Sequence, residues 1–287
     1  ELSELEIEAD NVFMTRSGLN RLRRDAVHVL REVIIAANTP EPCVRAACAA
    51  PVRIPVKKAV VVNVPLEAKL APDICGIADA VVFQPVDYNE LTAPECPKPK
   101  YLKLPIFASE RDLFILRSGM EIIKQFDGVY ASNPYAVQFA RENGLKYIAG
   151  WQLNITNSFS AGVYSDAEYI ISSVEENTAG CILYKGGRIP LMTLVHCPYK
   201  DIGGSCDKCA YDGELYFTDD RNKKLLVKRY RLSRCYFELI DGAPVSNPAV
   251  TQGAYYDLMY FGTSEINDFI NGNLFEKPPK NSFRGLK

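Results

Sequence analysis

Short apolar segments recur along the middle of the chain, and polar, glycine or proline residues separate them. Segments of this kind, rich in β-branched and aromatic residues, predict strands. The predicted strands are residues 60–64, 80–83, 101–104, 128–131, 147–149, 169–172 and 181–184. Mixed segments at residues 112–125 and 134–143 predict helices between them. Because strands of a parallel sheet are buried on both faces and read as continuous apolar runs, this alternation indicates an α/β protein.

The strands recur about every 20–25 residues, which suits a TIM-like (β/α) barrel, complete or partial. A doubly wound open sheet is the alternative. No G-x-G-x-x-G motif and no phosphate-binding loop motif follows any of the strands, which argues against a dinucleotide-binding fold. After residue 186 the pattern changes to three β-rich segments, at 215–217, 225–227 and 235–240, which predict a small β-hairpin appendage.

The N-terminal part of the chain is organised differently. Ser17 is a candidate N-cap, and apolar residues follow it at helical spacing, so a helix is predicted from there to about Asn38. Four prolines between residues 39 and 56 indicate a linker. The predicted divisions are an N-terminal helical segment and linker (1–56), a (β/α) barrel-like domain (57–200), a cysteine-rich β appendage (201–245), and a C-terminal strand, helix and tail (246–287), with that strand at residues 255–261.

Composition narrows the class of protein. The chain has 287 residues, of which 47% are hydrophobic, and this is enough for a sizeable core. Its nine cysteines are irregularly spaced, unlike those of a secreted disulfide-linked domain, so a reducing cytoplasm is expected. No run of eighteen apolar residues and no signal peptide is present, so no membrane span is expected. The chain starts at Glu1 rather than Met, and we therefore expect it to be part of a longer protein.

Four cysteines lie close together in the last third of the sequence, at Cys197, Cys206, Cys209 and Cys235. The pair Cys206-Asp-Lys-Cys209 has the two-residue gap that directs two thiolates at one ion. With the other two cysteines, the pair would complete either a zinc site or a 4Fe–4S cluster site. The alternative interpretation is four unrelated thiols.

Polar residues just after the predicted strands are candidates for a substrate pocket, because barrel enzymes carry their chemistry there. Lys103, Asn154, Asn157 and Arg188 would line a pocket for an anionic substrate. The alternative is that they cap helices or bond loop backbone groups. Only two histidines are present and no hydrolase motif appears, so no catalytic residues are predicted.

Residues 221–234 contain seven basic residues and no acidic ones, and the aromatic residues Tyr216, Phe217, Tyr230 and Tyr236 lie in or beside this segment. A basic hairpin with aromatic side chains can hold RNA by phosphate contacts and stacking. A strand hairpin with one solvated basic face is the simpler alternative. The net charge of the whole chain is −2, which does not itself indicate a polyanionic partner.

Several segments together carry a resemblance to a known family. They are Arg188-Ile-Pro-Leu-Met192, His196-Cys197-Pro198, Cys206-x-x-Cys209, Thr218-Asp-Asp-Arg221 and Cys235, with residues 153–158 and 19–26. In these segments the chain resembles the collagenase-like peptidase family U32, and in particular the C-terminal half of its long bacterial members. The chain departs from the family at Pro190, which occupies the place of a family cysteine, and it lacks the Glu-x-Phe opening of the peptidase signature.

The resemblance implies an activity and partners. Several members of that family are oxygen-independent hydroxylases of tRNA, ribosomal RNA or ubiquinone precursors, with a 4Fe–4S cluster on four cysteines and, in some, prephenate as the oxygen donor. By this resemblance the chain is part of an RNA-modifying enzyme that acts on tRNA or rRNA, with prephenate as a co-substrate and the N-terminal half of a longer chain as its partner. The alternatives are a collagenase-like peptidase and a non-catalytic, zinc-stapled module that binds RNA or substrate.

Overall fold

The structure is a computed structural model. It describes residues 14–39, 58–67, 72–201, 205–206, 209, 214–218, 220, 222–247, 250 and 253–271. The prolines of the predicted linker and the predicted C-terminal tail lie outside these residues. The chain divides into two compact units, Glu1–Ala50 and Pro51–Lys287.

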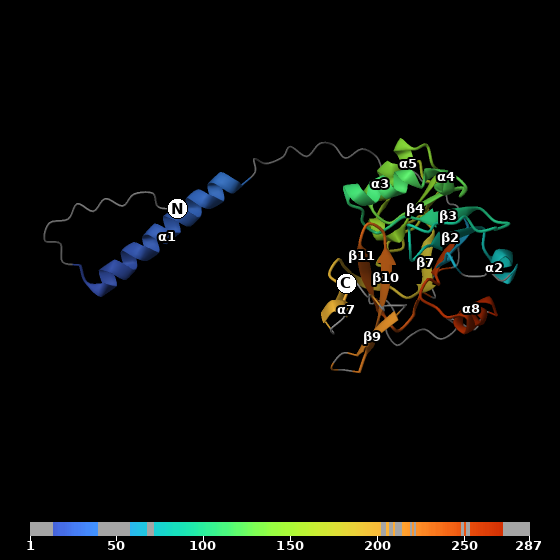
Figure 1. Ribbon diagram of the computed structural model, residues 1–287. Coiled ribbons are helices and arrows are strands. Elements are labelled where there is room, and N and C mark those ends of the chain that lie inside the picture. The colour runs from blue at the N-terminus through green and yellow to red at the C-terminus, as the bar shows by residue number, and fades with distance from the viewer. Residues whose placement is uncertain are drawn as a thin grey trace. The chain divides into compact units, whose positions relative to one another are not determined.

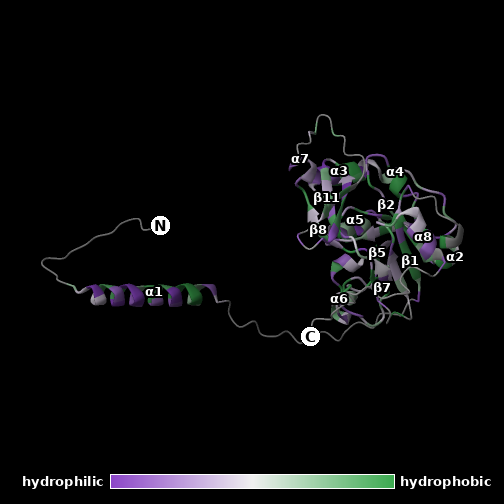
Figure 2. Cartoon of the chain, turned by 90° about the horizontal axis from the view of Figure 1, so that it is seen from below, coloured by the Kyte–Doolittle hydropathy of each residue, from purple (hydrophilic) through white to green (hydrophobic). Residues whose placement is uncertain are grey.

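The first unit contains helix α1 (Arg16–Asn38), which was predicted. Its N-cap is Thr15 rather than Ser17, because the Thr15 hydroxyl accepts a hydrogen bond from the Gly18 amide at 3.2 Å. Ser17 lies inside the first turn, so the predicted cap was wrong by two residues. Hydrophilic and hydrophobic positions alternate along the helix, and none of its residues is buried within the unit (Figure 2).

The second unit is built on a nine-stranded sheet. Its order is β12-β7-β13-β1-β2-β3-β4-β5-β6, and every neighbouring pair is parallel except β12 with β7. The strands are β1 (Val60–Pro65), β2 (Ala80–Gln84), β3 (Lys100–Lys103), β4 (Gly128–Ala131), β5 (Tyr147–Ala149), β6 (Tyr169–Ile170), β7 (Leu183–Gly187), β12 (Val245–Ser246) and β13 (Ala254–Asp257). The predicted parallel sheet is therefore present, with β13 from the C-terminal segment lying between β7 and β1.

The sheet is strongly curled. The rings of Tyr130 in β4 and Tyr255 in β13 stack with centroids 5.7 Å apart, although three strands lie between β4 and β13 in the sheet. A parallel bridge between Ile171 and Ile182 also joins the end of β6 to the residue just before β7. One face of the sheet is therefore concave and encloses the side chains that point from it.

Alternation along each strand produces two apolar layers, because successive side chains point to opposite faces. In β1, Val61 belongs to the inner cluster with Tyr130 and Tyr255, whereas Val62 belongs to the outer cluster. The outer cluster also contains Leu116 and Phe139 from the helices that cover the sheet. Both faces of the strands are thus buried, which accounts for their uninterrupted apolar sequences.

Short helices connect the strands. They are α2 (Pro72–Ile77), α3 (Glu110–Ser118), α4 (Met120–Ile123), α5 (Pro134–Glu142), α6 (Ser158–Gly162), α7 (Pro198–Asp201) and α8 (Thr263–Ile270), with a 3-10 turn, η1, at Trp151–Leu153. The predicted helix at 112–125 is divided at Gly119 into α3 and α4. In Figure 1, α3, α4 and α5 lie together on one side of the sheet, and α2 lies beside α8. Within the described residues, no helix combines the length and apolarity that a membrane span requires.

A second, antiparallel sheet contains the segments at 215–217, 225–227 and 235–240 that were predicted to be β-rich. Its order is β8-β11-β10-β9, with β8 (Pro190–Leu194), β9 (Glu214–Thr218), β10 (Lys224–Arg231) and β11 (Cys235–Asp241). It begins at Pro190, within the segment assigned from the sequence to the barrel-like domain. Leu226, Tyr230, Tyr236 and Ile240 on one of its faces pack with Met259 and Tyr260, which follow β13. The small sheet therefore covers the carboxyl end of the curled sheet.

Candidate functional site

Four polar side chains form a buried layer at the carboxyl ends of neighbouring parallel strands. They are Asn63 in β1, Gln84 in β2, Lys103 in β3 and Asp257 in β13, and each is at most 4% exposed. Each lies two residues after a member of the inner apolar cluster, so all four point to the inside of the curl. Lys103 was predicted from the sequence as a pocket residue, and the structure places it in this layer.

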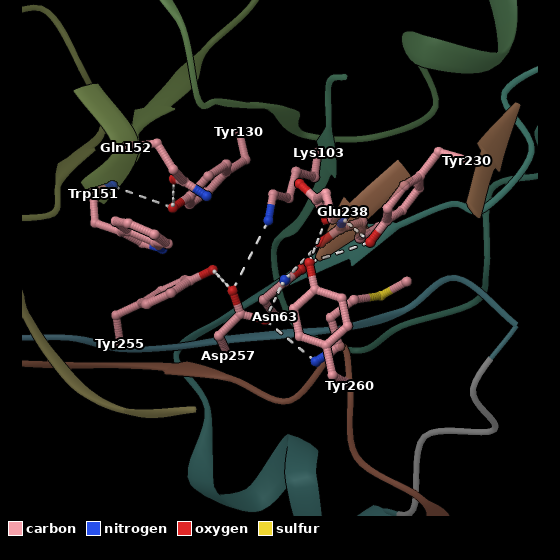
Figure 3. Close-up of polar contacts among 12 residues, drawn as sticks. Asn63, Lys103, Tyr130, Trp151, Gln152, Tyr230, Glu238, Tyr255, Asp257 and Tyr260 are labelled. Carbon is pink, nitrogen blue, oxygen red and sulfur yellow. Dashed lines mark hydrogen bonds and ion pairs between the residues drawn. The ribbon is translucent and has the colours of Figure 1, made fainter. Parts of the chain in front are cut away.

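Asp257 is the centre of this layer (Figure 3). Its Oδ1 accepts hydrogen bonds from Asn63 Nδ2 at 2.9 Å and from the Met259 amide at 3.3 Å. Its Oδ2 accepts one from the Tyr255 hydroxyl at 3.3 Å and lies 3.9 Å from Lys103 Nζ. Asp257 and Lys103 therefore form a buried ion pair whose carboxylate has several donors around it.

A second buried carboxyl, Glu238, reaches this region from the small sheet. The Tyr260 hydroxyl donates a hydrogen bond to Glu238 (Figure 3). The Tyr230 hydroxyl accepts one from Gln84 Nε2 at 2.9 Å and donates one to the Tyr260 hydroxyl at 3.3 Å. Burial raises the pKa of Glu238, although Lys103 and the tyrosine hydroxyls act in the opposite direction. Glu238 is thus driven toward its neutral form, whereas Asp257 has a cationic partner.

Some buried polar atoms of the described residues have no hydrogen-bond partner. They are Asn63 Oδ1, Ser132 Oγ, Trp151 Nε1 and the Tyr184 hydroxyl. Trp151 and Tyr184 are in edge-to-face contact at 5.7 Å, and Tyr184 belongs to the inner cluster. Because buried polar atoms are nearly always hydrogen-bonded, these are positions where water or a small ligand would be stabilised.

The four cysteines singled out in the sequence all line one cavity of about 630 Å³. Cys197 comes just before α7, and Cys235 begins β11. Cys206 and Cys209 are exposed, the other two are half-buried, and all four are free thiols. The structure thus brings to one cavity the thiols that sequence spacing grouped together.

Cationic side chains surround these thiols. Arg229, Arg231 and Arg234 line the same cavity, and Arg229 Nη1 lies 3.4 Å from Cys209 Sγ. Burial raises the pKa of Cys235, Arg229 and Arg231 lower it, and nearby Cys209 and Cys197 raise it. Guanidinium groups near a thiol favour the thiolate, which is the form that binds metals.

Two features limit what the thiols do as they stand. Among the described residues, no three His, Cys, Asp or Glu side chains have an arrangement that already fits a metal ion. The cavity also lies on the outer face of the small sheet, because Arg229 and Arg231 alternate along β10 with Tyr230, which faces the buried polar layer. A group bound by the cysteines would therefore be separated from Asp257 and Lys103 by the small sheet.

The other predicted pocket residues take part in separate polar networks. The Asn157 side chain caps α6, accepting from the amides of Phe159 and Ser160. Asn154 adopts a left-handed backbone after η1, and its Oδ1 accepts from the Ser173 hydroxyl at 3.3 Å. Asn157 thus caps a helix, as in the alternative interpretation, whereas the Asn154 side chain bonds to another side chain.

Arg188 forms a different network. It pairs with Glu265 at 2.7 Å, donates to the carbonyl oxygens of Gly242 and Tyr260, and lies over the Phe261 ring at 4.3 Å. Its guanidinium is thus already engaged with protein groups on several sides.

Sequence reasoning missed the two buried carboxyls. Asp257 ends an apolar strand in the same way as Asn63 and Lys103. A polar residue at the end of an apolar strand was the pattern used to predict pocket residues, and Asp257 fits that pattern. It was missed because the last strand was predicted to continue to residue 261, whereas β13 ends at Asp257 and a turn follows. Glu238 had no local signal, since a single acidic residue in a strand is usually solvated.

Comparisons with models of protein families, with curated proteins and with solved structures gave no match to this chain. The family resemblance of its motifs therefore stays a prediction.

Proposed function

We propose that this chain binds a single metal centre through Cys197, Cys206, Cys209 and Cys235, and that it serves as the metal-binding part of an RNA-modifying hydroxylase. The observation that carries the proposal is the meeting of all four thiols at one cavity. Cys197 and Cys235 come from segments on either side of β9 and β10, so sequence proximity alone does not account for it.

The residues present fit a thiolate-ligated group. Four sulfur donors are the ligand set of both structural zinc and a 4Fe–4S cluster. Thiolates repel one another when no metal is bound, so an open arrangement is expected before binding. A 4Fe–4S cluster would supply electron transfer, whereas zinc would join the β8–β11 sheet to the loop that carries Cys206 and Cys209. A reducing cytoplasm would keep the thiols available.

The rest of the fold supports an enzyme of the barrel type. In the proposed arrangement the bridge between Ile171 and Ile182 closes the curled sheet into a TIM-like (β/α) barrel. The polar layer of Asn63, Lys103 and Asp257 then lies at the carboxyl ends of the strands, where barrel enzymes carry their catalytic groups. The arginines beside the cysteines would contact the phosphates of tRNA or rRNA. The motif resemblance to collagenase-like peptidase family U32 adds prephenate as the oxygen donor.

A specific observation favours a second candidate. The cysteine cavity and the polar layer lie on opposite faces of the small sheet. A zinc ion at the cysteines would stabilise the sheet without taking part in chemistry, and the chain would be a zinc-stapled module that binds RNA or substrate. The identity of the metal separates the two candidates.

The test is anaerobic purification of the chain followed by metal and sulfide analysis and an optical spectrum. About four irons and four sulfides per chain, with broad absorption near 400 nm, are expected for the hydroxylase. One zinc without colour would support the binding module. Cys206→Ser and Cys235→Ser should lose the metal, whereas Cys181→Ser, a buried cysteine outside the cavity, should keep it. A chain that binds no metal, or that binds it equally in all three variants, would refute both candidates.

RNA binding is tested separately with the same protein. Replacing Arg229 and Arg231 with glutamine should weaken binding of tRNA and reduce its dependence on salt, because fewer counterions are released. Replacing Arg117 and Arg141, an arginine pair outside the cavity, serves as the control. Equal losses in both double variants would show that the cavity has no particular role in RNA binding. Cleavage of collagen or casein that disappears with Cys235→Ser would instead support the peptidase alternative.

A further inference from the structure

Two cysteines that the metal proposal does not use lie against each other. Cys75 is in α2 and only 9% exposed, and Cys96 is half-buried in the loop that joins β2 to β3. Their side chains are in hydrogen-bond contact, although the two residues are 21 positions apart in the sequence. Neither of them lines the cavity of the other four cysteines. The pair is therefore a second group of thiols at a different place in the fold.

Backbone contacts at the amino ends of the strands bring the two segments together. Helix α2 ends just before β2 begins, and the Val81 amide of β2 donates to the Pro99 carbonyl at 2.9 Å. The end of the β2–β3 loop is thus fixed beside the start of β2. Cys96 also packs against the outer apolar cluster, to which Ile74 of α2 belongs. The meeting of the two thiols therefore follows from the way the parallel sheet is built.

The two thiols differ in their access to solvent. Burial and the neighbouring Cys96 thiol raise the pKa of Cys75, whereas Lys98 lowers it. Because the thiolate is the reactive form of cysteine, the buried Cys75 reacts slowly with a dissolved oxidant. Cys96 lies between the exposed residues Glu95 and Pro97, in a segment without helix or strand. Cys96 is therefore the thiol that an oxidant reaches first.

We propose that Cys75 and Cys96 are a site of reversible oxidation and form a disulfide with each other. The oxidant is a low-molecular-weight disulfide such as oxidised glutathione. The Cys96 thiolate attacks one sulfur of the oxidant, which forms a mixed disulfide and releases one glutathione thiolate. The Cys75 thiolate then attacks Cys96 Sγ, which forms the protein disulfide and releases the second glutathione thiolate. Two protein thiols are thus oxidised, one glutathione disulfide is reduced, and the two protons pass to the released thiolates.

The disulfide would fasten a loop that also contacts the small sheet. Tyr88, in the same loop as Cys96, donates through its hydroxyl to the Lys103 carbonyl at 3.0 Å. Its amide donates to the Arg231 carbonyl at 2.9 Å, and the Arg231 amide donates to the Val86 carbonyl at 2.8 Å. The start of the loop is therefore held by β10, and the disulfide would hold its end to α2. Closing a loop of about 20 residues restricts the unfolded chain, so the oxidised protein should be more stable.

The proposal goes beyond the proposed function and does not depend on it. In the reducing cytoplasm expected from the sequence, disulfides are usually transient and redox-sensing. The pair would therefore respond to a rise in oxidant rather than hold a permanent bond. Failure of the chain to bind a metal would leave this proposal standing, and failure of the disulfide to form would leave the metal proposal standing.

The test is oxidation of the folded full chain with oxidised glutathione, followed by denaturation with N-ethylmaleimide to block the remaining thiols. Cleavage after Glu90 and Glu95 places the two cysteines in different peptides. Mass spectrometry should find these two peptides joined by a disulfide, and dithiothreitol should separate them. Cys181, a buried cysteine outside the pair, should be recovered as a blocked thiol.

Thermal unfolding gives a second readout. Oxidation should raise the unfolding midpoint of the unaltered chain by about 5–10 °C. Cys96→Ser, at the half-buried position, should abolish this rise, as should Cys75→Ala, which keeps an apolar side chain at the buried one. Cys181→Ala should show the same rise as the unaltered chain.

Three results would overturn the proposal. The first is that the peptides with Cys75 and Cys96 stay unlinked after oxidation. The second is that they are joined mainly to glutathione or to other cysteines. The third is that oxidation raises the unfolding midpoint of Cys96→Ser as much as that of the unaltered chain.

Discussion

Replacing Asp257 with alanine should strongly destabilise the second unit. The substitution removes the acceptor for Asn63 Nδ2, the Met259 amide and the Tyr255 hydroxyl. It also leaves the ammonium of Lys103, whose side chain is only 5% exposed, without its carboxylate partner. The perturbation therefore combines lost hydrogen bonds with a buried charge that has lost its ion-pair partner.

The expected size follows from these contacts. A net contribution of about 1 kcal/mol for each of the three hydrogen bonds gives about 3 kcal/mol. Breaking a buried ion pair by removing one partner costs about 3–5 kcal/mol in total. We therefore expect Asp257→Ala to lower the free energy of unfolding by about 3–5 kcal/mol, a large share of the stability of a typical domain.

Urea denaturation followed by circular dichroism measures this loss. Asp166→Ala is the matched control, because it removes a carboxylate from Arg141 in a pair that is about half exposed, where about 1 kcal/mol is expected. Lys103→Met/Asp257→Ala should be more stable than Asp257→Ala by about 1 kcal/mol or more, since the stranded charge is removed. Similar losses for Asp257→Ala and Asp166→Ala, or no recovery in the double variant, would refute the reasoning.

Three further variants test other parts of the structure. Burial raises the pKa of Glu238, so protonation of this carboxyl stabilises the fold fully below about pH 4. This stabilisation is lost as the pH rises through the raised pKa. Glu238→Gln should therefore remove this part of the pH dependence of the urea denaturation midpoint. A Cβ at Gly150 would lie 2.5 Å from the Tyr130 ring, so Gly150→Ala should lower the free energy of unfolding by about 1–3 kcal/mol. A Cβ at Gly76 would meet no atom within 4 Å, so Gly76→Ala should leave the thermal unfolding midpoint unchanged. Asn157→Ala should lower the free energy of unfolding by about 1 kcal/mol, because the Asn157 side chain caps α6, and an unchanged urea midpoint would contradict this role.

The local elements of the fold were largely predictable from the sequence. The strands predicted at 128–131 and 147–149 coincide with β4 and β5, because short apolar runs between polar turns leave little freedom in their ends. The strand predicted at 181–184 is observed at Leu183–Gly187, since Ile182 contributes only an isolated bridge before it and Cys181 lies in a bend.

The order of the strands could not be predicted. Periodicity reports whether a residue is buried and not which strand lies beside it. The contact between Asn63 and Asp257 spans 194 residues, and no local pattern encodes it. The same limit applies to the site: spacing grouped the four cysteines, which are close in sequence, but it could not reveal that Lys103, Glu238 and Asp257 converge. Buried carboxyls in strands look like solvated ones until the packing is known.

The position of β13 has a consequence for how the polypeptide matures. Strand β1 has β2 on one edge and β13 on the other, and the ribosome makes β13 long after β1, since Asn63 and Asp257 are 194 residues apart. A nascent chain that has already emerged through β7 must keep one edge of β1 unpaired and Tyr130 without its stacking partner. Edges of this kind are prone to association with other chains. Completion of the sheet therefore waits until β13 has been synthesised, and the interval before it is when a chaperone would be needed.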